Sequence, residues 1–293
     1  MKSGVIILDK PKGWTSHDAV AKLRRLLGER RVGHGGTLDP LATGVLPVFI
    51  GRATRAADYI TFADKEYVAK MRLGIITDTQ DITGKVLSVC DDKPSLEAIK
   101  SVLKEFTGEI LQVPPMYSAI KKGGEKLYEL ARKGIEVPRE GRPVKIYRLE
   151  LTGCDGDEYE LHICCSKGTY VRTLCDDIGR RLGCGACMTA LRRTRNGPFT
   201  LEQAVTISEV SEWAEKGRAE PDFIKSIDCL WPELPKTLGD ERKIRNGAAY
   251  RVSLPDGRYR VYGENGDFLM LGEVRQGMMK TIKSFFEVDN DGK

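Results

Sequence analysis

The sequence predicts an α+β fold followed by a small all-β module. Up to about residue 216, stretches with apolar residues at helical spacing are interleaved with stretches in which apolar and polar residues alternate. Beyond Arg242 only short alternating stretches remain, and the dipeptides Asp256-Gly257 and Asn265-Gly266 between them are typical of hairpin turns. Three prolines between residues 221 and 235 mark a linker-like region before this module. We therefore place one domain at residues 1–228 and a second at residues 229–293.

In the first half of the larger domain, each element follows from its local pattern. A helix is expected to begin at Ser16 and to end at Gly28, because glycine favours the left-handed conformation that follows a helix. Residues 66–73 alternate as a strand does, which places Tyr67 on the apolar face. Ser95 is expected to cap a helix that ends near residue 106. The other elements expected here are a helix at residues 52–60 and strands at residues 5–8 and 85–89.

Residues 112–142 differ from their surroundings. This stretch contains Pro114-Pro115, Gly123-Gly124 and many basic residues, but few apolar residues that could anchor it. We expect a mobile segment with a short helix at residues 125–133. The elements expected after it are strands at residues 144–152, 159–165 and 188–193, and helices at residues 170–182 and 207–216.

Charge and composition limit the classes of function. The 293 residues carry a formal net charge of +5 and give a pI near 8.7, which permits a polyanionic partner without requiring one. No stretch reaches the ~18 to 20 apolar residues of a membrane span, and the apolar run near the N-terminus is too short for a signal peptide. We therefore expect a cytoplasmic protein without a membrane partner. Part of the paired basic residues is expected to contact phosphates; the pairs are Arg24-Arg25, Arg30-Arg31, Lys121-Lys122, Arg180-Arg181, Arg192-Arg193 and Arg242-Lys243.

Motifs for bound cofactors are absent from the sequence. It has no glycine-rich phosphate loop followed by Lys-Ser/Thr, no dinucleotide fingerprint and no recognisable set of metal ligands. Cys184 and Cys187 form a Cys-x-x-Cys pair, which could be a redox centre or half of a zinc site. No second pair of this kind accompanies it, so we favour two thiols packed in a turn. Any chemistry is therefore expected to use side chains alone, without a metal or cofactor.

Residues 35–44 are the most informative stretch. They place one carboxylate, Asp39, in a loop that otherwise consists of glycine, threonine, proline and small apolar residues. Glycines at both ends allow a partner to approach the backbone closely, and Pro40 favours an extended conformation for Asp39. An isolated Asp-Pro pair is also an ordinary turn signal.

The segment at residues 35–44 resembles the catalytic loop of the TruB family, whose members make pseudouridine in the T loop of transfer RNA. The resemblance recurs in order along the chain. Residues 9–16 resemble the family's N-terminal Lys-Pro-x-Gly motif, and Lys65-Glu66-Tyr67 with residues 74–81 resembles its second motif. Residues 167–172 and 191–194 resemble the third motif, and the final segment resembles a PUA domain, a small RNA-binding module.

This resemblance implies a pseudouridine-synthase fold, which is a mixed, largely antiparallel sheet with flanking helices. Residues 112–142 would be a thumb-like insertion that closes on RNA, and residues 229–293 a PUA-like domain. The implied activity is that of a transfer-RNA pseudouridine-55 synthase, an isomerase that needs no cofactor and binds the T-arm stem-loop. A monomer is expected.

The resemblance also assigns roles to individual residues. Asp39 is implied as the nucleophile, Arg172 as the cation that orients it, and Tyr67 as a stacking platform for the extruded base. On the substrate side, Leu191 would form an apolar floor, Tyr170 would lie near the base, and His34 would fill the gap that the flipped base leaves. Lys10 belongs to the same group, although we expect it to buttress the loop with Pro11 rather than touch the substrate. Asp78 and Asp81 are interpreted as turn builders.

Three alternatives remain open from the sequence. One is the branch of the same family that works inside a guide-RNA particle with protein partners; members of that branch typically lack the insertion. Another is a non-catalytic protein that binds or folds RNA. The third is a thiol oxidoreductase built on Cys184 and Cys187.

Overall fold

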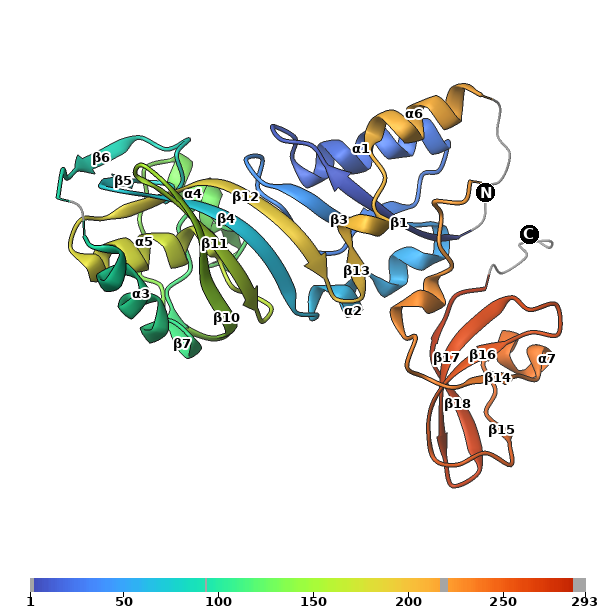
Figure 1. Cartoon of the computed structure of the whole chain (residues 1–293). Helices are drawn as coiled ribbons and strands as arrows, with labels where there is room; N and C mark the ends of the chain where they lie inside the picture. The colour runs from blue at the N-terminus through green and yellow to red at the C-terminus, as the bar shows by residue number, and fades with distance from the viewer. Residues whose placement is uncertain (1–2, 93, 217–220, 287–293) are drawn as a thin grey trace.

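A nine-stranded sheet runs through the long body of the molecule, and a smaller β domain is attached at one end (Figure 1). The computed structural model describes residues 3–92, 94–216 and 221–286. The main path of the sheet has the order β1-β3-β12-β4-β11-β10-β7, while β13 pairs with β12 and β2 pairs with β3. The strands are β1 (Gly4–Lys10), β2 (Val32–His34), β3 (Thr43–Ile50), β4 (Lys65–Leu73), β7 (Gly108–Gln112), β10 (Arg142–Asp155), β11 (Glu158–Cys165), β12 (Ala186–Asn196) and β13 (Phe199–Thr200).

Strand β12 joins the two halves of this sheet. It pairs antiparallel with β4 over most of its length and makes a short parallel pairing with β3, where Arg193 lies opposite Gly44. The other pairings described within this sheet are antiparallel. The expected mixed, largely antiparallel sheet is therefore confirmed.

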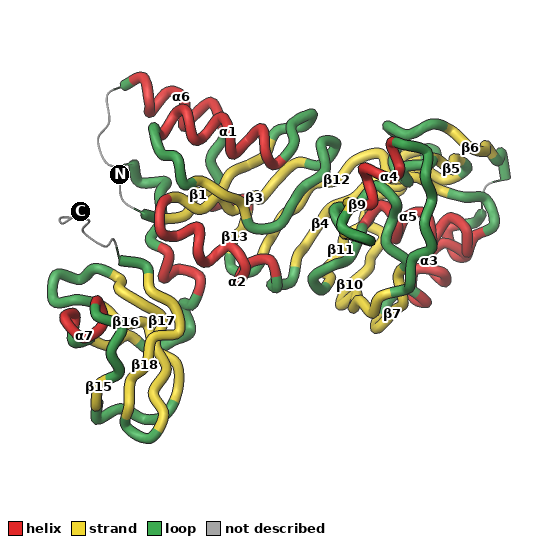
Figure 2. Tube along the Cα trace, turned by 180° about the vertical axis from the view of Figure 1, so that it is seen from behind, coloured by secondary structure: helices red, strands yellow, loops and turns green. Residues whose placement is uncertain are grey.

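The helices form two groups, one at each end of the body (Figures 1 and 2). Helix α1 (Ser16–Leu27) packs beside α6 (Ile207–Glu215), and α3 (Leu96–Glu105) packs beside α5 (Val171–Leu182). Helix α1 begins with a capping box between Thr15 and Asp18 and ends at Gly28, whose φ is 65°. Its expected bounds are thus confirmed, as are those of the other three helices to within about a residue. The expected helix at residues 52–60 is instead a 3₁₀ helix, Gly51–Ala56, followed by the short α2 (Ala57–Thr61).

Two apolar clusters hold the body together, one on each face of β1. Ile6 and Leu8 belong to the first cluster with α1, whereas Val5 and Ile7 belong to the second. Because both faces of β1 are buried, its sequence is a continuous apolar run and does not alternate between apolar and polar residues. The second cluster also includes Phe285 of the C-terminal module, so this cluster attaches the module to the body.

The C-terminal module is a five-stranded sheet with the order β14-β16-β17-β18-β15 and one short helix. The expected hairpin at Asn265-Gly266 joins β16 to β17, with Gly266 at a φ of 83°. No hairpin forms at Asp256-Gly257, because β15 pairs with β18 and not with β16. The elements are β14 (Lys236–Leu238), α7 (Glu241–Arg245), β15 (Tyr250–Arg251), β16 (Gly257–Tyr262), β17 (Phe268–Arg275) and β18 (Met278–Ser284).

The proposed domain boundary at residues 228/229 falls within a 3₁₀ helix, Ile227–Leu230. Both ends of this helix pack in the second apolar cluster, next to Trp231. The Trp231 ring lies edge-on to Tyr59 of the body, with the ring centroids 5.1 Å apart, and 5.9 Å from the Phe285 ring. Residues around the boundary therefore contact both parts of the chain.

Residues 112–142 contain a short strand pair, β8 (Lys121–Lys122) with β9 (Glu125–Lys126), and then α4 (Leu127–Arg132). The helix is shorter than the expected 125–133, because its first residues pair as a strand.

The expected strand at residues 85–89 is β6 (Val86–Val89), which forms a hairpin with the unexpected β5 (Ile75–Thr77). None of the helices within the described residues has the length and apolar character that crossing a bilayer requires.

Candidate active site

The loop that carries Asp39 connects β2 to β3 and is tied to the start of α1. Ser16 Oγ accepts a hydrogen bond from the Leu38 backbone N–H at 2.9 Å and donates one to the Leu38 carbonyl at 3.2 Å. The Gly13 N–H donates to the Pro40 carbonyl at 2.8 Å. With its neighbours fixed in this way, the Asp39 side chain remains 37% exposed. The carboxylate is therefore presented to solvent from a constrained backbone.

Arg193 of β12 is hydrogen-bonded to the backbone of this loop and of the start of β3. Its side chain is buried, and it donates hydrogen bonds to the carbonyl oxygens of Val45 at 2.7 Å and Gly36 at 3.0 Å. Burial lowers the pKa of Arg193, while the nearby Tyr67 hydroxyl acts in the opposite direction. Arg193 belongs to one of the basic pairs of which part was expected to contact phosphates, but it is buried and contacts the loop instead; the sequence could not indicate this, because its partners lie about 150 residues away in the chain.

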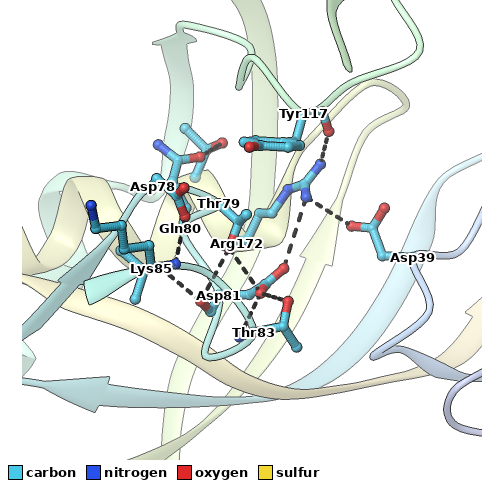
Figure 3. A network of polar contacts seen from close by, with 11 residues as sticks. Asp39, Asp78, Thr79, Gln80, Asp81, Thr83, Lys85, Tyr117 and Arg172 are labelled. Atoms are coloured by element: carbon cyan, nitrogen blue, oxygen red, sulfur yellow. Dashed lines mark hydrogen bonds and ion pairs between the residues drawn. The ribbon is translucent and has the colours of Figure 1, made fainter. Parts of the chain in front are cut away.

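Arg172 faces two carboxylates from the first turn of α5. Its Nη1 lies 3.6 Å from Asp39 Oδ2 and 3.9 Å from Asp81 Oδ2. Its Nη2 donates a hydrogen bond to the Tyr117 carbonyl, which belongs to the insertion at residues 112–142. Figure 3 shows the guanidinium between these three partners. The Arg172 side chain is only 7% exposed, so one buried cation links the Asp39 loop, the second motif and the insertion.

Asp81 is more than the turn builder that the sequence indicated. Its Oδ1 accepts hydrogen bonds from Thr79 Oγ1 at 3.0 Å and from the Thr83 backbone N–H at 2.9 Å, which do form a turn. The other oxygen faces Arg172, and the side chain is 6% exposed. Asp78, in contrast, accepts a hydrogen bond from the Lys85 backbone N–H at 2.8 Å and serves the turn (Figure 3). Two aspartates three positions apart in one motif gave no signal that could separate these roles.

Gln80 fixes the backbone immediately before Asp81. Its φ of 65° is rare for a residue other than glycine. The side chain is held by α5: Thr173 Oγ1 donates to Gln80 Oε1 at 2.6 Å, and Gln80 Nε2 donates to Asp176 Oδ2 at 3.0 Å. Because Arg172 lies on the same helix, these contacts set the position of Asp81 relative to Arg172.

Tyr67 and Leu191 lie next to each other on the adjacent strands β4 and β12. In the pairing of β4 with β12, Leu191 lies opposite Ala69 and Arg193 opposite Tyr67. Both Tyr67 and Leu191 are buried. Burial raises the pKa of the Tyr67 hydroxyl, and the negative charge of Asp39 adds a smaller effect in the same direction.

Tyr170 precedes α5 and is fixed by Gln112 at the end of β7. The Tyr170 backbone N–H donates to Gln112 Oε1 at 2.8 Å, and Gln112 Nε2 donates back to the Tyr170 carbonyl at 3.1 Å. Burial raises the pKa of the Tyr170 hydroxyl, and Asp39 contributes in the same direction. The negative charge of Asp39 thus raises the pKa of both tyrosine hydroxyls, because the fold brings the three residues close together.

Lys10 is the last residue of β1 and is buried near Asp39. Its ammonium donates hydrogen bonds to the carbonyl oxygens of Trp14 at 2.6 Å and Pro11 at 2.9 Å, and the residue is fully buried. Burial lowers the pKa of Lys10 to about 8, although the charge of Asp39 opposes this. This position fits a buttress and does not expose Lys10 to a substrate.

His34 ends β2 and packs edge-on against His17, with ring centroids 5.4 Å apart. Burial lowers the pKa of His34 to about 4, and the charges of His17 and Arg193 add to this. Its Nδ1 is buried and has no hydrogen-bond partner among the described residues. His34 is therefore neutral at pH 7 and retains an unused polar atom.

The cysteine pair has the environment of packed thiols. All eight cysteines are free; Cys184 is buried in the turn between α5 and β12, and Cys187 is buried within β12. Burial raises the pKa of both thiols, that of Cys187 to about 11. A redox-active thiol needs a lowered pKa and access to solvent. This geometry does not favour the oxidoreductase alternative.

Family models match most of the chain. Residues 24–171 match the model for the TruB family pseudouridylate synthase (N terminal domain), and residues 172–230 match the tRNA pseudouridylate synthase B C-terminal domain. The chain is 45% identical over 281 residues to tRNA pseudouridine synthase B of Stutzerimonas stutzeri (strain A1501), covering 94% of this chain and 92% of the relative. It is 46% identical to the protein of the same name from Aromatoleum aromaticum, over 92% of this chain and 88% of the relative.

Solved structures match as well. The chain is similar to a chain of a Cbf5-Nop10-Gar1 complex, with a TM-score of 0.72, 30% sequence identity, and coverage of 97% of this chain and 85% of that chain. A second match is an H/ACA RNP bound to a substrate RNA containing 2'-deoxyuridine, with a TM-score of 0.71 and 28% identity over 98% of this chain and 86% of that chain.

Proposed function

The chain belongs to the TruB family of pseudouridylate synthases, and from this membership we propose how the residues around Asp39 convert a uridine of transfer RNA to pseudouridine. The relatives that match nearly its whole length carry the name tRNA pseudouridine synthase B. The activity is that of an isomerase acting on the T-loop uridine, position 55. The observation that carries the mechanism is the approach of Arg172 to Asp39 at 3.6 Å.

The reaction balances without a co-reactant. The glycosidic bond between N1 and C1′ breaks, and a bond between C5 and C1′ forms. C5 loses its hydrogen as a proton, and N1 gains a proton, so nothing is oxidised, reduced or hydrolysed. A positioned carboxylate can serve as the nucleophile in glycosyl chemistry of this kind. Asp39 is the partly exposed carboxylate of the loop and takes this role in our proposal.

Arg172 is proposed to orient the Asp39 carboxylate. A guanidinium offers a rigid set of donors, so it fixes the direction of a carboxylate better than a flexible ammonium does. Asp81 lies 3.9 Å from the same Nη1 that faces Asp39, and the Tyr117 carbonyl accepts a hydrogen bond from Nη2, so the guanidinium has partners on both of its terminal nitrogens. The three contacts together support a preorganised nucleophile.

The uridine must leave its stack before it can react. We propose that the extruded base lies against the Tyr67 ring, above Leu191, with Tyr170 on the other side of the site. Tyr67 and Leu191 lie on the adjacent strands β4 and β12, and Tyr170 immediately precedes α5, the helix that carries Arg172. His34, which is half-buried at the end of β2, would fill the gap that the base leaves in the RNA.

Transfer RNA is the proposed partner, bound by an autonomous monomer in the cytoplasm. The insertion at residues 112–142 supports a chain that works without partner proteins, because its Tyr117 carbonyl contacts Arg172 within the site. One solved structure that matches this chain is a Cbf5-Nop10-Gar1 complex and another is an H/ACA RNP with a substrate RNA, which keeps the guide-dependent branch as the alternative.

The substrate is tested with unmodified transfer RNA and the purified chain alone. Pseudouridine is located by chemical derivatisation and mass spectrometry, and a transfer RNA with cytidine at position 55 serves as the control. Pseudouridine at position 55 without any guide RNA is the expected result. Modification that appears only when guide RNA and partner proteins are added would favour the other branch of the family.

A further inference from the structure

A cluster of three potential metal ligands lies on the central sheet, outside the site described above. Glu66 of β4 and His162 and Cys164 of β11 place their ligand atoms within 4.8 Å of one another. His162 Nε2 lies 2.8 Å from Glu66 Oε1.

The strand geometry explains why these three side chains meet. His162 and Cys164 are two residues apart on β11, so both point to the same face of the sheet. Glu66 lies directly opposite Cys164 in the antiparallel pairing of β4 with β11. The neighbouring residues Tyr67, Ile163 and Cys165 are buried on the other face, which leaves the cluster on the outer face. The backbone of two adjacent inner strands therefore fixes the positions of all three side chains.

We propose that Glu66, His162 and Cys164 form a binding site for one Zn²⁺ or a divalent ion of similar softness. Thiolate sulfur, imidazole nitrogen and carboxylate oxygen are the ligands that zinc uses in proteins. Two ligand atoms on one tetrahedral zinc ion lie about 3.3 to 3.8 Å apart, so the side chains would have to move together by up to about 1.5 Å to bind it. A fourth position would be taken by water, because His162 and Glu66 are 19% and 26% exposed.

The charges around the cluster are compatible with a bound cation. A thiolate and a carboxylate supply two negative charges, which neutralise a divalent ion once the Cys164 thiol has released its proton to solvent. Arg195 Nε lies 3.2 Å from Glu66 Oε2, the oxygen that does not face His162. Arg195 thus holds the carboxylate from behind and leaves Oε1 for the ion, as an outer-shell residue does at other metal sites.

A simpler reading is a plain polar network of Glu66, His162 and Arg195. Glu66 bridges the other two residues without any metal, and hydrogen bonding from His162 lowers the pKa of Glu66. The two readings differ in what they require of Cys164. The network does not use the thiol, whereas zinc would bind it.

The first test measures protection of Cys164 in the wild-type chain. The full chain is reduced, freed of metal, and treated with a thiol-alkylating reagent with and without equimolar Zn²⁺, and each cysteine is followed by peptide mass spectrometry. Cys154, an exposed thiol of the neighbouring strand β10, is the internal control. Zinc is expected to slow alkylation of Cys164 at least about tenfold and to leave Cys154 unchanged. Equal rates at Cys164 with and without zinc would overturn the proposal.

The second test titrates the chain with Co²⁺, which reports a metal–thiolate bond by its charge-transfer absorption. One Co²⁺ per chain with this band is expected for the wild type and for Cys154→Ser. The band should be lost in Cys164→Ser and weakened in His162→Ala, with folding checked by circular dichroism. A band that persists in Cys164→Ser would assign the metal to another thiol, and no band in the wild type would leave the polar network as the explanation.

Discussion

Gly44 lies against the backbone of Arg193 so closely that a side chain on it has no room. A Cβ on Gly44 would be 2.2 Å from the Arg193 carbonyl oxygen and 2.9 Å from its backbone nitrogen. The φ of Gly44 is also 99°, which other residues rarely adopt. The contact occurs where β3 meets β12, directly after the loop that carries Asp39. The position of the Asp39 loop therefore depends on a close approach between two backbones.

Gly44→Ala is expected to destabilise the chain by at least about 2 kcal/mol, because backbone strain and a backbone clash add together. Chemical denaturation measures this loss. Gly156→Ala is the matched control, since Gly156 has a φ of 59° but nothing within 4 Å of the added Cβ. The control should cost only about 1 kcal/mol, from strain alone. Equal losses in both variants would show that the approach to Arg193 is not a tight one.

Arg172→Lys is expected to lower kcat about 10²-fold and to change KM little. The substitution keeps the positive charge but loses the rigid donors that reach Asp39, Asp81 and the Tyr117 carbonyl. Steady-state kinetics on a T-arm substrate measure the effect. Arg181→Lys on the same helix is the control, because Arg181 forms an exposed ion pair with Glu105. Wild-type kcat in Arg172→Lys would mean that charge alone suffices.

Asp81→Asn and Asp78→Asn separate two aspartates of one motif. Asp81 is buried and faces Arg172, whereas Asp78 contacts only the turn among the interactions described. Loss of the charged partner should cost about 1.5 to 3 kcal/mol of transition-state stabilisation, a ten- to hundredfold fall in kcat. Asp78→Asn should remain within a few-fold of the wild type. A larger loss in Asp78→Asn would reverse the assignment.

The pH dependence of stability should contain a contribution from His34. Burial lowers its pKa in the folded chain from 6.5 to about 4. Between these values the unfolded chain binds a proton that the folded chain does not, so stability falls as the pH falls from 6.5 towards 4. Thermal unfolding of His34→Gln should show a shallower decline over this range. Parallel curves for the variant and the wild type would show that His34 is protonated equally in both states.

Local patterns predicted most elements of the larger domain, because helix caps and the spacing of apolar residues depend on only a few neighbouring residues. Helix α1, with its cap at Thr15 and its end at Gly28, is one example. The hairpin expected at Asp256-Gly257 failed for a tertiary reason. β15 pairs with β18, and the Asp256 carboxylate instead accepts a hydrogen bond from the Gln276 N–H at 2.8 Å. Gln276 and Gly277, both at positive φ, form the turn between β17 and β18 that the pattern did not indicate.

The site was predictable only as far as the resemblance reached. It named Asp39, Arg172 and Tyr67, which the fold brings to one place. It gave no role to Arg193, whose contacts with the loop span more than 140 residues of sequence. The contact between Glu66 and His162 was also not predictable from the sequence, because 96 residues separate the two and no local motif includes both.

Asp39 is proposed to be the nucleophile of a cofactor-free isomerisation. The most direct measurement follows tritium release from C5 of the uridines in a T-arm stem-loop, using the wild type and Asp39→Asn, with a metal chelator and no added cofactor. We expect stoichiometric release by the wild type and none by Asp39→Asn, with RNA binding retained by both. Undiminished release from Asp39→Asn would contradict the account.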